Sequence, residues 1–373
     1  MIVEKKKFSI DSFHFEDAGV SIPVEFGYET YGRLNSNDDN AVMVCHYFTG
    51  TSHAAGRYDP SDPAPGWWDR IIGPGKIIDT DRVFVLATDV FSNINHHNPM
   101  VHTTGPASIN PATGEEYGMD FPMFTLKDCV RAQKMLSDHL GIKKFKLVMG
   151  PSMGGLQAFL WGRFYPEMTG AIISVVATPM IRPYGIMIPN QMGIYSIMLD
   201  PRWNKGRYYG QEPPRDGLLL AFKVLLMSTR TDHWMEEQFG RNLADPQKDP
   251  RLAFENRYLV EKGVEDIVLG RMQFFDANAY IYIARANSLY DLQEKGQSRE
   301  EAWASITAPT LMIIDRSDLL FTPDQAQQAT KHMPDADVFY YDSGNGHLSC
   351  LFDIHLFEDA IAKFINKKEL VTR

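Results

Sequence analysis

Residues 145–161 read FKLVMGPSMGGLQAFLW, which places a short turn between an apolar run and a segment able to form a helix. Within the turn, Gly150, Ser152 and Gly154 follow a Gly-x-Ser-x-Gly spacing. A sharp turn from a strand into a helix crowds the backbone, and glycine on both sides of the serine avoids clashes. The pattern predicts a strand, a strained turn that holds Ser152 above a sheet as a nucleophile, and a helix beginning beside it. A Gly-rich turn without chemistry is the alternative, but the strand-like and helix-like flanks argue against it.

Apolar runs on both sides of this turn predict the rest of the sheet. Residues 24–31 alternate between apolar and polar side chains, as an edge strand does. Residues 125–140 carry apolar side chains near i, i+4 spacing and predict a helix. Buried strands are predicted for six short runs closed by turn residues: 41–45, 83–87, 145–149, 171–176, 310–314 and 338–341. Strands that alternate with helices indicate an α/β fold with a mostly parallel, doubly wound sheet.

Residues 179–298 lack strand-like runs and show helical spacing instead. Three apolar stripes run through this segment, at residues 194–198, 218–226 and 280–289. We predict that residues 179–298 form an inserted helical lid subdomain, and that residues 1–178 and 299–373 form the α/β core domain.

Composition and charge exclude several classes of protein. Lys and Arg number 37 against 47 Asp and Glu, so a net charge of -10 does not favour nucleic acid or anionic lipid. The 3 cysteines are too few and too scattered for a disulfide framework or a cysteine zinc site, which fits a reducing compartment. No apolar run approaches the roughly 18 residues that span a bilayer. We expect a cytoplasmic protein with no nucleic-acid or membrane partner.

A serine nucleophile needs a base and an acid that orients the base, and after this kind of turn the acid precedes the histidine along the chain. The loop after residues 310–314 holds Asp315 and Asp318. We favour Asp318, because Asp315 ends the strand and is better placed to cap it or to pair with Arg316. Asp315 remains the alternative acid.

Three histidines follow these carboxylates. His332 falls within the helical pattern of residues 323–333, and His355 within a C-terminal helical pattern, so a solvated helix face explains both. His347 instead follows the last predicted strand and the turn at residues 342–346, which can present an imidazole above the sheet edge. We predict that His347 is the base.

An oxyanion that develops during attack by serine needs two backbone N–H donors. The residue after the nucleophile, Met153, supplies the first. The predicted strand at residues 41–45 runs into a loop that contains Phe48, whose backbone we expect to supply the second.

No metal or cofactor is expected. His96, His97 and His102 cluster in one loop, but no HExxH pattern or acidic ligand spacing accompanies them. Residues 73–76, Gly-Pro-Gly-Lys, resemble part of a phosphate-binding loop, but the complete GxxxxGK[ST] pattern fails.

Several motifs along nearly the whole chain resemble one family, the homoserine O-acetyltransferases of the α/β-hydrolase fold. They are Gly66-Trp67-Trp68-Asp69, Gly73-Pro74-Gly75-Lys76, Asp79-Thr80-Asp81, Thr104-Gly105-Pro106-Ala107-Ser108-Ile109-Asn110-Pro111, Ser152-Met153-Gly154-Gly155, Phe275-Asp276-Ala277-Asn278-Ala279-Tyr280 and Asp318-Leu319-Leu320-Phe321. Other α/β hydrolases share the serine turn but not the remaining motifs.

The resemblance implies an acyl-CoA-dependent O-acyltransferase of methionine biosynthesis. It implies Ser152 as nucleophile with Asp318 and His347 as its partners, acetyl-CoA as co-substrate, L-homoserine as acceptor, and a homodimer. The lid subdomain would then cover the site and exclude water while acetyl-Ser152 persists.

The chain departs from the family where the acceptor binds. The family's carboxylate-anchoring Arg, six residues ahead of an Asp-Pro pair, is here Ile194, and its Asp after the catalytic His is Leu348. A family Tyr after a lid Thr is here Arg230. We predict that Arg230 binds the acceptor in place of the missing Arg. The alternative is that the chain is a serine esterase or thioesterase acting on another substrate.

Overall fold

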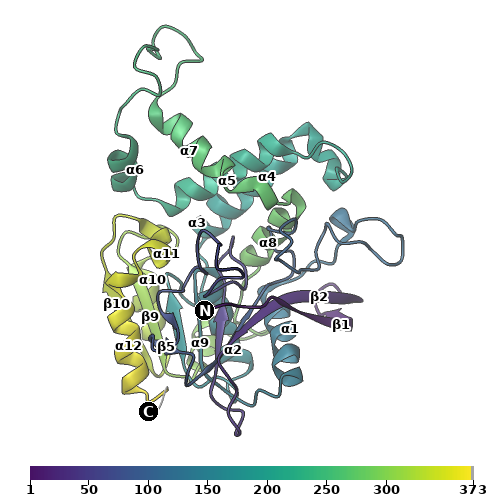
Figure 1. Cartoon of the computed structure of the whole chain (residues 1–373), viewed down its shortest axis with the longest axis vertical. Coiled ribbons are helices and arrows are strands. Elements are labelled where there is room, and N and C mark those ends of the chain that lie inside the picture. The colour runs from purple at the N-terminus through teal and green to yellow at the C-terminus, as the bar shows by residue number, and fades with distance from the viewer. Residues whose placement is uncertain (371–373) are drawn as a thin grey trace.

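The computed structural model describes residues 1–370, and within them a mixed sheet of 8 strands forms the centre of the molecule (Figure 1). Its strands are β1 (Lys6–Phe15), β2 (Val20–Tyr31), β3 (Ala41–Cys45), β6 (Phe84–Thr88), β7 (Phe145–Pro151), β8 (Ile172–Val175), β9 (Thr310–Asp315) and β10 (Ala336–Tyr341). They lie in the order β1-β2-β6-β3-β7-β8-β9-β10. The pairs β1/β2 and β2/β6 are antiparallel and all other pairs are parallel. A separate short pair joins β4 (Ile72–Gly73) to β5 (Ile78–Asp79). The mostly parallel sheet predicted from the sequence is confirmed.

The edge of the sheet differs from the prediction. β2 pairs on both sides, and β1, which the sequence reading did not predict, occupies the edge. The register of β1 shifts between Ile10 and Phe13, so two residues interrupt the alternation of buried side chains. A bulge of this kind breaks the period of two on which strand prediction depends.

Side chains of β3 show how the sheet divides two cores. Val42 and Val44 belong to one buried cluster, and Met43, on the other face, belongs to the second. The flanking helices of the core are α1 (Leu126–His139), α2 (Met153–Phe164), α9 (Arg299–Ala304), α10 (Pro323–Thr330), α11 (Ser349–Phe352) and α12 (Glu358–Lys367). Apolar residues of α1 and α2 pack on the Met43 face, and those of α12 pack on the Val42 face. The sheet is therefore covered on both faces, as a parallel sheet requires.

A helical segment is inserted between β8 and α9 and stands over one end of the sheet (Figure 1). Its helices are α3 (Pro183–Gly185), α4 (Gly193–Leu199), α5 (Arg215–Thr229), α6 (Asp232–Phe239), α7 (Leu259–Leu269) and α8 (Ala277–Ser288). A π-helical stretch, Ile186–Met192, joins α3 to α4. Helix α8 ties the insertion to the core, since the Tyr282 hydroxyl donates to the Phe121 carbonyl oxygen at 2.6 Å. The exact division at residues 178/179 and 298/299 stays a prediction.

Candidate active site

The turn between β7 and α2 holds Ser152 in a strained conformation. Ser152 has φ 54° and ψ −121°, in the left-handed region that non-glycine residues rarely occupy. A Cβ atom at Gly150 or Gly154 would collide with the carbonyl oxygen of Cys45 on the neighbouring strand. The Ser152 amide donates to the Val175 carbonyl oxygen at 2.8 Å, which fixes the turn against β8. The two glycines thus allow a close approach that places the serine hydroxyl above the sheet.

Ser152, His347 and Asp318 form a continuous series of hydrogen bonds. His347 Nε2 lies 2.8 Å from Ser152 Oγ, and His347 Nδ1 lies 2.8 Å from Asp318 Oδ2. An ionised carboxylate only accepts, so Nδ1 carries a proton and Nε2 is free to accept the serine proton. His347 and Asp318 are 4% and 3% exposed, which protects the series from water. Ser152 is therefore placed for activation as a nucleophile.

The Asp318 carboxylate is held by its own loop. Its Oδ1 atom accepts hydrogen bonds from the amides of Leu320, at 2.8 Å, and Phe321, at 3.3 Å. These bonds turn Oδ2 toward His347. The Phe321 ring also stacks on the imidazole, with ring centroids 5.8 Å apart.

The alternative candidates lie outside this series. Asp315 ends β9, and its Oδ1 accepts from the amide and hydroxyl of Ser317 at 2.9 and 2.8 Å. Burial raises the pKa of Asp315, and its Oδ2 has no partner within residues 1–370. His332, in the turn after α10, and His355, in a short helical turn before α12, are both exposed.

The two predicted oxyanion donors border the same cavity as Ser152. Met153 is the first residue of α2, and Phe48 lies in the turn after β3. Within residues 1–370, neither backbone amide donates a hydrogen bond to a protein acceptor. Two unsatisfied N–H groups beside a nucleophile are the arrangement that an oxyanion hole requires.

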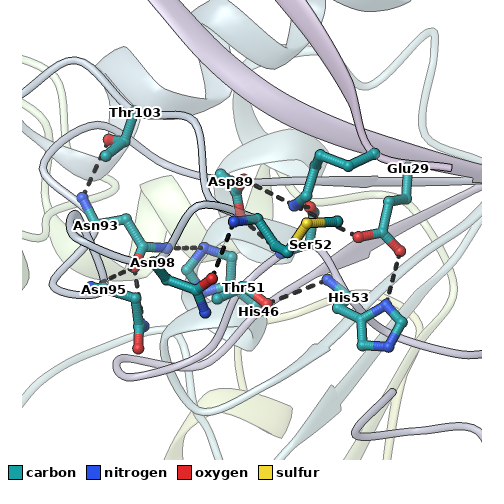
Figure 2. Close-up of polar contacts among 12 residues, drawn as sticks. Glu29, His46, Thr51, Ser52, His53, Asp89, Asn93, Asn95, Asn98 and Thr103 are labelled. Carbon is teal, nitrogen blue, oxygen red and sulfur yellow. Dashed lines mark hydrogen bonds and ion pairs between the residues drawn. The ribbon is translucent and has the colours of Figure 1, made fainter. Parts of the chain in front are cut away.

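Figure 2 shows polar side chains that follow β6, among them Asp89, Asn93 and Asn95, and their hydrogen bonds fix the loop that carries Phe48. Asn95 Nδ2 donates to the Thr49 carbonyl oxygen at 3.0 Å, and Asn93 Nδ2 donates to that of Gly50 at 3.0 Å. Asp89 Oδ1 accepts from the Ser52 amide at 2.7 Å. The loop geometry is thus set by side chains from another part of the chain.

A buried ion cluster supports Asp89 in turn. Lys5 Nζ lies 3.0 Å from Asp89 Oδ2 and 3.4 Å from Glu29 Oε1, and both carboxylates are buried. Burial alone would raise the pKa of Glu29, but the hydrogen bond with His53 and the charge of Lys5 lower it overall. The lowered pKa keeps Glu29 ionised, and Lys5 bridges the Glu29 and Asp89 carboxylates.

The cavity in front of Ser152 lies between the insertion and the core, is walled by both, and is largely apolar. It has an empty volume of about 1050 Å³, including its open mouth. Its apolar walls include Ile181, Phe222, Leu225, Leu226, Ile267, Val268, Phe275, Leu320, Phe321, Leu348 and Leu351. Among the described residues that line it, Arg271 is the only Lys or Arg, and none is Asp or Glu.

The residues that line this cavity do not include Arg230, so its predicted contact with the acceptor stays a prediction that the lining does not support. Its guanidinium carbon lies 4.3 Å from the centroid of the Trp234 ring and 5.0 Å from that of Phe352. Its Nη1 donates to Asn345 Oδ1. Burial, followed by the nearby charge of Arg271, lowers the pKa of Arg230 to about 10.

Arg271 lines the cavity, although the sequence analysis did not predict it as a site residue. It follows α7 and precedes the Phe275–Tyr280 motif by four residues, so proximity to that motif was the one available signal. Its side chain is exposed, and within residues 1–370 it makes no salt bridge.

The described histidines form no metal centre. Within residues 1–370, no group of three or more His, Cys, Asp or Glu side chains is placed to hold a metal ion. His97 Nε2 instead lies 3.7 Å from Asp276 Oδ2, and that carboxylate raises the pKa of His97. Burial lowers the pKa of the neighbouring His96.

None of the helices within residues 1–370 is long and apolar enough to cross a membrane.

The family model of the alpha/beta hydrolase fold matches residues 100–353, which include all three members of the hydrogen-bonded series. A homoserine O-acetyltransferase of Deferribacter desulfuricans is 38% identical over 361 residues, covering 96% of this chain and 93% of that protein. The chain belongs to the homoserine O-acetyltransferase family.

Solved structures agree with this placement. The homoserine O-acetyltransferase of Bacillus anthracis is 40% identical, with a TM-score of 0.92 and coverage of 98% of each chain. The structure of esterase E22 is 35% identical, with a TM-score of 0.91, and the match covers 97% of this chain and 100% of that one. A homoserine O-acetyltransferase and an esterase thus share the full architecture of this chain.

Proposed function

We propose that this chain is an acetyl-CoA-dependent homoserine O-acetyltransferase that works through an acetyl-Ser152 intermediate. The observation that carries the proposal is the pair of 2.8 Å contacts linking Ser152 Oγ to His347 and His347 to Asp318. Membership of the homoserine O-acetyltransferase family supports the choice of donor and acceptor.

The first half-reaction acetylates Ser152. His347 Nε2 takes the hydroxyl proton while Oγ attacks the thioester carbonyl carbon. The Met153 and Phe48 amides stabilise the resulting oxyanion. The carbon–sulfur bond then breaks, and the CoA thiolate leaves with the proton from His347.

The second half-reaction runs the same chemistry in the opposite direction. The acceptor hydroxyl gives its proton to His347 and attacks the acetyl carbonyl, after which Ser152 Oγ leaves and regains a proton. Asp318 keeps the imidazole in the required tautomer in both halves and stabilises the imidazolium. The apolar walls of the cavity limit the access of water to the acetyl-enzyme.

Arg271 is the residue we assign to the acceptor carboxylate. Among the described residues that line the cavity, it is the only Lys or Arg. Within residues 1–370, its guanidinium forms no salt bridge with a carboxylate of the protein. A guanidinium binds a carboxylate through two parallel hydrogen bonds.

A serine esterase is the second candidate, and two observations favour it. No described lining residue is an acid that could pair with the ammonium group of homoserine, and Leu348 borders the cavity beside His347. Esterase E22 also shares the architecture of this chain. An apolar ester would bind in such a cavity without needing a charged partner from the protein.

Mass spectrometry after incubation with acetyl-CoA distinguishes these functions. We expect one acetyl group on Ser152, and rapid loss of that group to homoserine with formation of O-acetylhomoserine. Serine and water alone are the control acceptors. Loss of the acetyl group to water at the same rate with and without homoserine would establish the esterase instead.

We also propose a homodimer formed through the insertion. Large apolar side chains at least 40% exposed gather on its α4, α5 and π-helical segments: Met187, Met192, Tyr195, Met198, Leu199, Leu220 and Met227. Exposed apolar surface of this kind marks an interface. Light scattering should give the mass of a dimer for the wild type and the mass of a monomer for Leu199→Glu. A monomeric wild type would contradict the proposal.

A further inference from the structure

Two neighbouring residues of the insertion hold the turn that leads to His347. Arg230 follows α5, and its Nη1 donates to Asn345 Oδ1, two residues before His347. Thr231 donates through Oγ1 to the Gly344 carbonyl oxygen at 2.6 Å. The end of α5 is thereby joined to the loop that carries the proposed base.

The same turn is held from the core side by Asp353. Asn345 Nδ2 donates to Asp353 Oδ2 at 2.8 Å, and the Ser343 hydroxyl donates to the same oxygen. Asn345 therefore bridges a side chain of the insertion and a side chain of the core. The turn joins β10 to the short helical turn that begins at Gly346, and these side-chain bonds help to fix where it lies.

Arg230 is more deeply buried than a surface latch would need to be. It is 9% exposed, lies between the Trp234 and Phe352 rings, and leaves its Nε without a partner within residues 1–370. Burying a guanidinium is costly unless its charge is stabilised, and here two ring faces and one amide oxygen supply that stabilisation. The enclosure also fixes the direction of the Nη1 hydrogen bond, since the planar group cannot rotate freely.

We infer that Arg230 is a positioning residue for His347. Acting through Asn345, it sets the turn so that His347 Nε2 stays within hydrogen-bond distance of Ser152 Oγ when the insertion is docked on the core. The inference rests on the proposed function, because it requires His347 to be the base. It replaces the predicted contact of Arg230 with the acceptor by a role in both half-reactions.

A substrate without a carboxylate separates positioning from acceptor binding. p-Nitrophenyl acetate acylates Ser152 without using an acceptor site, and its burst of nitrophenolate reports the first half-reaction alone. For Arg230→Met we expect this burst to slow by about 10- to 100-fold, as for small misplacements of a catalytic group. The Michaelis constant for homoserine should stay within about twofold of the wild-type value, since a change remote from the acceptor leaves most of its binding intact.

Coupling to Asn345 supplies the second readout. Asn345→Ala should slow the burst to a similar degree, and the double variant should be no slower than the slower single variant, because both remove one interaction. Arg230→Lys keeps a donor and should recover part of the rate. Arg241→Met is the matched control, since Arg241 also faces an aromatic ring of the insertion, that of Tyr258, and its burst should match the wild type.

The outcomes that overturn the inference are distinct. An unchanged burst with a raised Michaelis constant for homoserine would make Arg230 an acceptor-binding residue. Multiplying losses in the double variant would show that Arg230 and Asn345 act independently. If Arg230→Met does not fold, Asn345→Ala is still sufficient as a test, because an undiminished burst in that variant refutes the inference. Failure of the proposed function is seen separately, as a burst that persists in Ser152→Ala.

Discussion

Replacing Asp318 by Asn tests the proposed acid, and the structure determines which way the new amide must face. Asp318 Oδ1 accepts from the amides of Leu320 and Phe321, so only the carbonyl oxygen of an asparagine can occupy that side. The NH₂ group must then face His347 Nδ1. A donor facing Nδ1 forces the imidazole proton onto Nε2, where it blocks transfer of the Ser152 proton.

The expected loss in turnover is on the order of 10⁴, which corresponds to about 5.5 kcal/mol in the activation barrier. Release of CoA, followed with a thiol reagent, measures it at saturating acetyl-CoA and homoserine. Asp315→Asn is the control, because Asp315 is equally buried near the end of β9 but bonds to Ser317 rather than to His347. Turnover of Asp318→Asn within tenfold of the wild type, or a larger loss in Asp315→Asn, would show that the wrong carboxylate has been chosen.

Three further predictions use other parts of the site. Ser152→Ala should keep the fold and lose most of the activity, with a residual rate of roughly 10³ to 10⁴ times the uncatalysed rate from the oxyanion hole and substrate binding. Acetylation of a residue other than Ser152 in the wild type would contradict this prediction. Arg271→Ala should raise the Michaelis constant for homoserine by about 10- to 150-fold, since a hydrogen bond to a charged group contributes roughly 1.5 to 3 kcal/mol, while acetylation of Ser152 stays unchanged. The raised pKa of His97 means that its contact with Asp276 stabilises the fold below the ordinary histidine pKa and loses this effect as the pH rises through the raised value. The difference in melting temperature between wild type and His97→Gln should therefore shrink from pH 5.5 to pH 8.5, and a growing difference would reverse the sign.

Local backbone demands explain why the centre of the site was predictable. The glycines around Ser152 are required by contact with Cys45, and that requirement is written in the sequence as a spacing. The order of strands then places the loops after β9 and β10 beside this turn, which brings Asp318 and His347 to Ser152 as predicted. Their catalytic roles stay predictions.

Features that depend on long-range packing were not predictable. The bulge in β1 interrupts its pattern of burial, so the edge strand was missed. The direction of Arg230 is set by the nearby Trp234 and by Asn345 and Phe352, which lie more than 100 residues further along the chain. No local pattern around Arg230 indicates whether it points into the cavity or toward the turn before His347. Arg271 likewise gained its significance only from the position of α7 over the core.

The division of labour between core and insertion explains how one architecture serves both transfer and hydrolysis. Ser152, Asp318 and His347 all come from turns and loops of the core, so the proposed acetyl-enzyme depends on the sheet and its turns. The insertion supplies Arg271 and about half of the residues that line the cavity, so we expect it to influence the choice between an acceptor alcohol and water. If Arg230 also sets the position of His347, the two parts are not independent, because the insertion that selects the acceptor also completes the base. A change in the insertion should then alter both the rate of the first half-reaction and the choice of acceptor. If the insertion only excluded water, such a change would alter only the ratio of acetyl transfer to the alcohol and to water.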